Sequence, residues 1–262
     1  MTHRPRKRFG QHFLHDKGVI DHIIQAIRPQ PTDDLVEIGP GEGVLTNRLA
    51  PLCGRLSAIE IDRDLATALE TQYSKDLHVQ IHLGDALKVD ICSLSQKDKK
   101  LRLVGNLPYN VSTPLLIHFL RSLDCIHDMH FMLQKEVVDR MVAGPGSKRY
   151  GRLSIAVQML CTVESLLDIG PGAFRPPPKV WSAVVRLQPR QQPLIDQAKF
   201  RVLEKFSQQL FSQRRKTLRK ILRDTISVEQ LEKLGIDSSR RPETLTLDEI
   251  VSLLDYVPVK RQ

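Results

Sequence analysis

An amide, a proline and an aromatic ring follow one short apolar run in the middle of the chain. The run Leu101–Gly105 is typical of a buried strand, and Asn106, Leu107, Pro108 and Tyr109 come directly after it. An amide can donate and accept hydrogen bonds, while proline fixes its own φ, so together they form one edge of a polar pocket. Because Asn and Pro are also ordinary turn formers, a plain turn is the alternative.

Carboxylates and glycines stand at similar positions after other apolar runs. Leu35–Ile38 contains Glu37 and is followed by the glycine loop Gly39–Gly43. Glu60 ends the next run, and Asp85 follows the one after. Glu60 comes 21 residues after the loop begins, which is the offset of a carboxylate that accepts hydrogen bonds from a ribose diol.

The glycine spacing discriminates between nucleoside cofactors. A dinucleotide fingerprint requires a third glycine where this chain has Val44. Acidic Glu37 suits a positively charged cofactor better than a pyrophosphate. The pattern therefore favours S-adenosylmethionine over NAD, with an NAD-dependent enzyme, or a glycine turn that binds nothing, as the alternatives.

Strand-like and helical patterns alternate over most of the chain. The expected strands are residues 35–38, 56–60, 79–83, 101–105, 129–133, 162–168 and 180–187. This alternation predicts an α/β fold, a doubly wound, mostly parallel seven-stranded sheet of Rossmann-like type. Ligands bind such a sheet beyond the carboxyl ends of its strands, which is where Glu37, Glu60, Asp85 and Asn106 stand.

The net charge of +9 is concentrated in two segments. Residues 1–10 carry four Lys/Arg and no acid, and residues 199–223 carry nine Lys/Arg against one acid, Glu204. This placement favours a nucleic-acid partner, with an anionic membrane surface as the second choice. No stretch is apolar enough to span a bilayer, and the amino terminus lacks the apolar core of a signal peptide.

The chain divides at a polar linker, Pro189–Pro193, beyond which only helical patterns occur. We expect a basic arm and cofactor-side segment at 1–15, a sheet domain at 16–188, and a small all-helical RNA-binding domain at 189–262. The four cysteines, Cys53, Cys92, Cys125 and Cys161, lie more than 30 residues apart and form no C-x-x-C pair. They predict reduced, mostly buried thiols in a cytoplasmic protein without a metal site.

These motifs resemble those of class I methyltransferases that act on an exocyclic amine. More closely, the chain resembles the ribosomal RNA adenine dimethyltransferases of the KsgA type, which modify two adjacent adenosines in the 3′-terminal hairpin loop of small-subunit RNA. The resemblance covers nearly the whole length and departs at His12, where many relatives carry Asn. Beside the strand ends it is carried by Phe9–Leu14, Gln134–Val137, Tyr150–Ser154, Phe174–Val180 and Phe211–Leu218.

The resemblance implies an S-adenosylmethionine site. Glu60 would hold the ribose, Asp85 the adenine amine, and the Gly39 region the methionine end. The implied cofactor-binding residues are His12, Leu14, Gly39, Glu60, Asp85 and Asn106.

The resemblance also implies how the target amine is held. The Asn106 side-chain oxygen and the Leu107 carbonyl would accept both N–H groups of adenine N6, while Pro108 keeps the loop in shape. Tyr109 would stack on the base and Phe174 would sandwich it. The alternative for both rings is ordinary core packing.

The basic segments are interpreted as RNA contacts. Consecutive basic residues fan around a helix and reach phosphates on several sides. The implied RNA-binding residues are Arg6, Lys7, Arg8, Arg214, Arg215, Lys216 and Arg219. The alternatives are a solvated helix face and a merely solubilising arm.

The expected function is dimethylation of N6 of two adjacent adenosines in small-subunit (16S) ribosomal RNA, by a monomer acting on the pre-30S particle during small-subunit biogenesis. The nearest alternative is an Erm-type dimethyltransferase of large-subunit RNA. A non-catalytic ribosome-assembly or RNA-binding factor is the alternative from another class.

Overall fold

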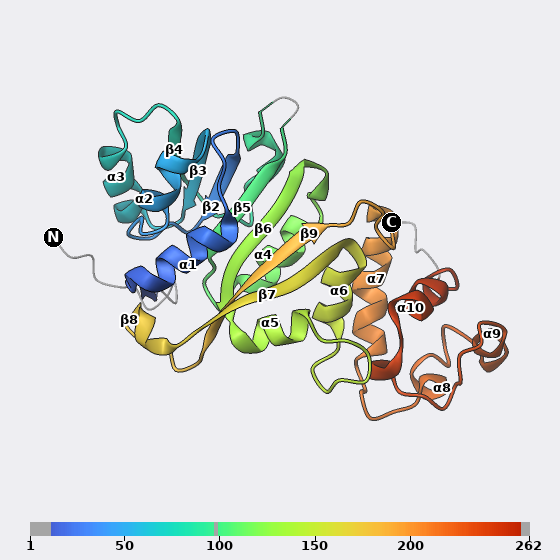
Figure 1. Cartoon of the computed structure of the whole chain (residues 1–262). Coiled ribbons are helices and arrows are strands. Elements are labelled where there is room, and N and C mark those ends of the chain that lie inside the picture. Colours follow the sequence, from blue (N-terminus) through green and yellow to red (C-terminus); the bar gives the residue numbers. More distant parts are fainter. Residues whose placement is uncertain (1–11, 97–98, 258–262) are drawn as a thin grey trace. The chain divides into compact units, whose positions relative to one another are not determined.

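A seven-stranded sheet forms the centre of the computed structural model, which describes residues 12–96 and 99–257 (Figure 1). The strand order is β4-β3-β2-β5-β6-β9-β7. β2, β3, β4, β5 and β6 run parallel to one another, and β9 is antiparallel to β6. The expected fold class is confirmed. The strands are β2 (Asp34–Ile38), β3 (Arg55–Glu60), β4 (Val79–Leu83), β5 (Leu101–Asn106), β6 (Ile126–Gln134), β7 (Cys161–Ile169) and β9 (Ser182–Pro189).

The strand order reverses between β2 and β5, which pair directly with each other. A crevice outside the carboxyl ends of the strands is therefore expected at this point. The two strand ends approach unusually closely, because a Cβ on Gly105 would lie 2.4 Å from the carbonyl oxygen of Ile38. Glycine at 105 lets Asn106 stand directly beside the glycine loop that follows β2.

Helices cover both faces of the sheet (Figure 1). Two consecutive residues of β6 illustrate the two faces, because successive side chains of a strand point to opposite sides of the sheet. Met132 joins the hydrophobic cluster beneath α1, whereas Phe131 stacks on Phe119 of α4 at 5.5 Å between ring centroids. The helices of this part are α1 (Lys17–Ile27), α2 (Thr46–Leu49), α3 (Arg63–Gln72), α4 (Ser112–Leu120) and α5 (Lys135–Met141), with short 3₁₀ turns η2 (Ala50–Leu52), η3 (Ile91–Leu94) and η4 (Leu123–Cys125).

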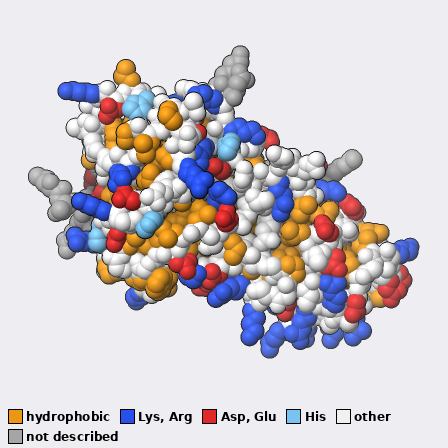
Figure 2. Space-filling view, in the orientation of Figure 1, with side chains coloured by type: hydrophobic (Ala, Val, Ile, Leu, Met, Phe, Trp, Pro, Cys, Tyr) orange, Lys and Arg blue, Asp and Glu red, His pale blue; other side chains and the backbone are white. Residues whose placement is uncertain are grey.

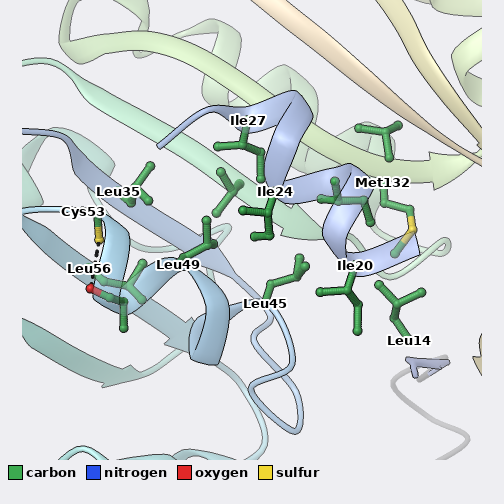
Figure 3. Packing of buried hydrophobic residues seen from close by; sticks show 14 of the residues in the cluster. Leu14, Ile20, Ile24, Ile27, Leu35, Leu45, Leu49, Cys53, Leu56 and Met132 are labelled. Atoms are coloured by element: carbon green, nitrogen blue, oxygen red, sulfur yellow. Dashed lines mark hydrogen bonds between the residues drawn. The ribbon is translucent and has the colours of Figure 1, made fainter. Parts of the chain in front are cut away.

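α1 illustrates how the pattern produces the packing. Its isoleucines recur at helical spacing and are buried, and the Asp16 side chain accepts a hydrogen bond from the Val19 N–H at 3.0 Å to cap the first turn. Figure 3 shows Ile24 and Ile27 on the side of Leu35 of β2 and Leu49 of α2, while Ile20 lies beside Leu14 and Leu45. This cluster fixes the layer that carries the glycine loop.

A second, two-stranded sheet was not expected from the sequence. β1 (Phe13–Leu14) pairs antiparallel with β8 (Phe174–Arg175), which follows the 3₁₀ turn η5 (Pro171–Ala173). Strands of two residues carry too little pattern to be recognised. The pairing joins the start of the described chain to the segment that leads into β9.

The chain divides into two compact units, residues 1–138 with 164–189, and residues 139–163 with 190–262. The expected division also places a boundary at Pro189, but it assigns Asp139–Val163 to the sheet domain. In the structure α6 packs against α7 and α10, so this segment belongs to the helical unit. The helices of that unit are α6 (Arg152–Leu160), α7 (Gln197–Leu210), α8 (Leu218–Ile221), α9 (Val228–Lys233) and α10 (Leu247–Leu254), with the 3₁₀ turn η6 (Pro242–Thr244).

Three local expectations are wrong. The consecutive basic residues Arg214–Lys216 were expected on a helix. In the structure α7 ends at Leu210, and residues 211–217 form turns before α8. The last strand begins at Ser182 rather than at Val180, which is exposed. Cys92 and Cys125 form a disulfide, since η3 and η4 bring their Cα atoms to 5.5 Å, whereas Cys53 and Cys161 are buried free thiols.

No helix within the described ranges has the length and apolar character that crossing a membrane would require.

Candidate active site

A pocket of about 210 Å³ lies at the carboxyl ends of β2, β3, β4 and β5. The four strand ends singled out from the sequence meet there, and the β1 segment closes one side. Nine of the ten residues expected to bind the cofactor or the target base line the pocket, and Phe174 does not. Those nine are His12, Leu14, Gly39, Glu60, Asp85, Asn106, Leu107, Pro108 and Tyr109.

The glycine loop is held by Glu60. The Glu60 carboxylate accepts hydrogen bonds from the Gly41 N–H at 3.0 Å and the Asp62 N–H at 2.8 Å. Gly39 and Gly41 both have positive φ, 67° and 61°, which places the loop backbone against the pocket. Burial raises the Glu60 pKa, and the backbone hydrogen bonds oppose this rise. With one backbone donor on each oxygen, the carboxylate keeps lone pairs for a further diol donor.

Glu37 lies at the floor of the pocket with 1% of its surface exposed. Burial raises its pKa to about 7, although the Thr46 hydroxyl donates a hydrogen bond to it at 2.7 Å. No described residue forms an ion pair with this carboxylate. A positively charged ligand in the pocket would supply the missing counter-charge.

Asp85 follows β4 and lines the same pocket. Its Oδ1 accepts a hydrogen bond from the Leu87 N–H at 3.0 Å, which fixes the turn after the strand. Its Oδ2 receives no hydrogen bond from the described part of the chain. This carboxylate is therefore a ready acceptor for an amine donor.

Asn106 is oriented by the segment before β1. Its Nδ2 donates to the His12 carbonyl oxygen at 3.1 Å, so the amide nitrogen is already used. Oδ1 is left as the acceptor of the side chain, and it has no donor among the described residues. The Leu107 N–H donates to the Met132 carbonyl at 3.1 Å, which ties the loop to β6.

Tyr109 is held from two sides. Its hydroxyl shares a hydrogen bond of 2.7 Å with Ser182, the first residue of β9. One face of its ring stacks on His12, with 5.7 Å between ring centroids, and His12 Nδ1 lies 2.7 Å from the Pro176 carbonyl oxygen. His12 is thus a support for the loop as well as part of the pocket wall.

Phe174 is placed differently from the expectation. It is 1% exposed and packs in the hydrophobic cluster with Leu14, its partner in the β1–β8 pair. In this arrangement the ring packs beneath the pocket wall instead of presenting a face to a base. This burial agrees with the alternative that Phe174 is an ordinary core aromatic.

Sequence reasoning missed several pocket residues. Ile61 is 48% exposed although it is a large apolar residue, and it lines the pocket beside Glu60. An apolar residue directly after a strand-end carboxylate was the available signal, and Ala86 after Asp85 repeats it. Ser182 does not line the pocket but supports Tyr109, and it gave no signal because this contact spans 73 residues of sequence.

The expected RNA-binding residues fall into two groups. Arg6, Lys7 and Arg8 lie outside the described residues. Arg215, Lys216 and Arg219 are exposed in the helical unit, and Figure 2 shows Lys and Arg side chains gathered over the segment between α7 and α8. Arg214 is exposed as well, and it also donates to the carbonyls of Lys148 and Tyr150 at 2.9 and 3.0 Å, which ties the segment to the residues before α6.

A parallel sheet with this strand order, one antiparallel strand beside its edge and a pocket of strand-end carboxylates defines a class I methyltransferase fold. The model of the family described as "Ribosomal RNA adenine dimethylase" matches residues 2–258. The chain belongs to this family of ribosomal RNA adenine dimethylases.

Relatives in sequence and structure agree with this membership. The chain is 52% identical to "Ribosomal RNA small subunit methyltransferase A" of Pseudomonas syringae pv. tomato, over 98% of this chain and 96% of the relative. The protein of the same name from Nitrosococcus oceani is 51% identical, over 98% and 97%. A dimethyladenosine transferase structure from Plasmodium falciparum matches with a TM-score of 0.79 and 27% identity, over 92% of this chain and 96% of that one. The 23S rRNA methyltransferase ErmE shares the fold, with a TM-score of 0.71 at 22% identity, over 94% and 99%.

Proposed function

We propose that the chain uses S-adenosylmethionine to dimethylate N6 of adenosine in small-subunit ribosomal RNA. Family membership gives the reaction, and the relatives at 52% and 51% identity carry small-subunit names. The likeness to ErmE lies at 22% identity and concerns the fold alone, so the large-subunit alternative is not favoured.

The pocket residues fit S-adenosylmethionine in their charges and acceptors. Glu37 is a buried carboxylate without a counter-ion among the described residues, as a cationic ligand requires. Glu60 has acceptor capacity for a ribose diol, and the positive-φ glycine loop beside it lets a ligand approach the backbone. Asp85 offers Oδ2 to an adenine amine. When bound, the cofactor supplies an electrophilic methyl group.

The observation that carries the proposal is the orientation of Asn106. With Nδ2 bound to the His12 carbonyl, Oδ1 serves as an acceptor for one N–H of an adenine amine. The Leu107 carbonyl is positioned by the same loop as the second acceptor. Two acceptors reduce delocalisation of the nitrogen lone pair into the ring, so positioning and electrostatics provide the catalysis.

The partner that we propose is RNA within the small ribosomal subunit. The exposed basic residues of the helical unit suit RNA phosphates. The substrate is a pre-30S particle in the cytoplasm, and the enzyme acts as a monomer during small-subunit biogenesis.

Incubation of purified protein with S-adenosylmethionine and unmethylated small-subunit particles tests the function. Mass spectrometry of the RNA nucleosides is expected to show N6,N6-dimethyladenosine in small-subunit RNA and none in large-subunit RNA offered in parallel. Asn106→Ala is expected to lower kcat at least about 100-fold, because a positioned acceptor is removed. Product absent from small-subunit RNA, or found in large-subunit RNA instead, would contradict the proposal.

Binding measurements separate catalysis from recognition. Asn106→Ala should keep its affinity for the RNA within about threefold, because one uncharged group adds little to a phosphate-dominated interface. If the variant loses RNA affinity and wild type makes no product, the chain is a binding factor.

A further inference from the structure

The only tryptophan of the chain, Trp181, is exposed, and the next residue, Ser182, bonds the pocket residue Tyr109. It retains 55% of its accessible surface, and its neighbour Val180 retains 43%. Exposed large aromatic side chains beside a pocket are candidates for ligand contact, because their burial by a partner is favourable.

Trp181 belongs to the loop of residues 176–181, which connects β8 to β9 (Figure 1). Both ends of this loop are attached to pocket residues. At one end the Pro176 carbonyl oxygen lies 2.7 Å from His12 Nδ1, and at the other the buried Ser182 bonds the Tyr109 hydroxyl. His12 and Tyr109 are themselves stacked. The loop therefore lies beside His12 and Tyr109, next to the place where the target adenosine is proposed to bind.

The tryptophan is held in a defined position. Its carbonyl accepts a hydrogen bond from the Lys135 N–H at 2.8 Å. The six-membered ring of the indole lies beside Gly170, at 3.8–3.9 Å from the place of a Cβ on that glycine. A rigid, half-exposed ring loses little conformational entropy when a partner stacks on it.

The segment that contains Trp181 carries two exposed basic residues. Arg175, which pairs with the pocket residue Phe13 in the β1–β8 sheet, is exposed, and so is Lys179. Neither forms an ion pair with a described residue. Lys135 is neutralised by Asp168 at 2.9 Å, so Arg175 and Lys179 remain to attract a polyanion. An exposed aromatic ring with unpaired basic residues in the same segment is a combination that suits single-stranded nucleic acid.

We propose that Trp181 stacks on an unpaired base next to the adenosine held at Asn106–Tyr109, while Arg175 and Lys179 contact the phosphates that flank it. The proposal rests on the function above. It makes Trp181 a positioning residue that holds the RNA strand in register with the pocket.

Fluorescence tests the contact directly, because the emission of this protein in its tryptophan band comes from Trp181 alone. The probe is a hairpin RNA with the loop sequence of the small-subunit 3′ end, and a fully paired duplex of equal charge is the control. We expect the hairpin to quench the emission and the duplex to leave it within about 10%, because stacking requires an unpaired base. Equal quenching by both RNAs, or by neither, would overturn the proposal.

Variants then test its consequence. Trp181→Ala is expected to weaken hairpin binding and raise KM between about 5-fold and about 150-fold, with kcat reduced less, and Trp181→Phe is expected to restore most of the loss. Leu77→Ala is the matched control, since Leu77 is 93% exposed and precedes β4 at the opposite edge of the sheet. A Trp181→Ala enzyme with unchanged affinity would refute the contact, whereas absence of product from wild type would refute the proposed function.

A protein partner is distinguished by the same measurements. If Trp181→Ala lowers binding to the assembled particle while its affinity for the hairpin is unchanged, the ring contacts a ribosomal protein and the RNA proposal is wrong.

Discussion

At the scale of single residues, the pocket contains two buried acids with different surroundings. Glu60 is bonded to two backbone N–H groups, so its hydrogen bonds oppose the effect of burial on its pKa. Glu37 has one hydroxyl donor, and burial raises its pKa to about 7. A group with this pKa changes its charge near neutrality, which makes cofactor binding sensitive to pH.

Affinity for S-adenosylmethionine is expected to increase with pH between about 5.5 and 7.5. Below the raised pKa the free protein carries a proton on Glu37, and a cationic ligand must displace it, so Kd rises by up to about tenfold per pH unit as pH falls. Calorimetric titration at several pH values measures this. Glu37→Gln should bind weakly with a flat profile, whereas Glu70→Gln, an exposed acid on α3, should behave as wild type. An unchanged slope in Glu37→Gln would show that another group titrates.

At the scale of elements, the pocket depends on the close pairing of β2 and β5. The β2–β5 ladder continues up to Val104, and glycine at 105 allows this next residue to lie against the backbone of Ile38. The second strand pair, β1 with β8, brings His12 to Asn106 and Tyr109. Both strand pairings position the loop Asn106–Tyr109, although neither contributes a charged group to the pocket.

Gly105→Ala is expected to destabilise the fold and disturb the loop together. Its Cβ would lie 2.4 Å from a backbone oxygen, so the strands must separate, at a cost of about 1–3 kcal/mol in the free energy of unfolding. Gly172→Ala is the matched control, because no atom lies within 4 Å of its Cβ position. Thermal unfolding and kcat of both variants provide the test, and a fully active, equally stable Gly105→Ala protein would contradict this explanation of the close strand pairing.

At the scale of the whole molecule, the pocket and the exposed basic residues between α7 and α8 belong to different units. The pocket residues all lie in the sheet unit, whereas Arg215, Lys216 and Arg219 lie in the helical unit. We propose that the first unit holds the reacting atoms and that the second contributes sequence-independent attraction to RNA phosphates.

Replacing Arg215, Lys216 and Arg219 by alanine is expected to weaken RNA binding and flatten its dependence on salt. The slope of log K against log salt should fall by about 1 for every phosphate that the variant no longer neutralises. Lys75→Ala, an exposed cation in the sheet unit, is the single-charge control. The affinity of the triple variant for S-adenosylmethionine should stay unchanged. An unaltered salt slope would show that the RNA does not contact these three residues. Arg214 is left intact because its removal would free two carbonyls.

The sequence by itself determined the sheet and most of the pocket. Periodic apolar runs specify the strands, and ligands of such sheets bind at the strand ends. Glu60, Asp85 and Asn106 can therefore each be predicted as pocket residues from their positions after these runs. The helical spacing of the isoleucines and the capping residue Asp16 likewise predict helix α1.

Only the tertiary structure decided the contacts between distant segments. The Tyr109–Ser182 bond, the His12–Asn106 bond and the Cys92–Cys125 disulfide join residues 33 to 94 positions apart, and no local pattern encodes such pairs. Burial of Phe174 depends likewise on the two-residue β1–β8 pairing. The physical reason is that periodicity records which face of an element is buried, whereas the partner on that face is chosen by the packing of the whole unit.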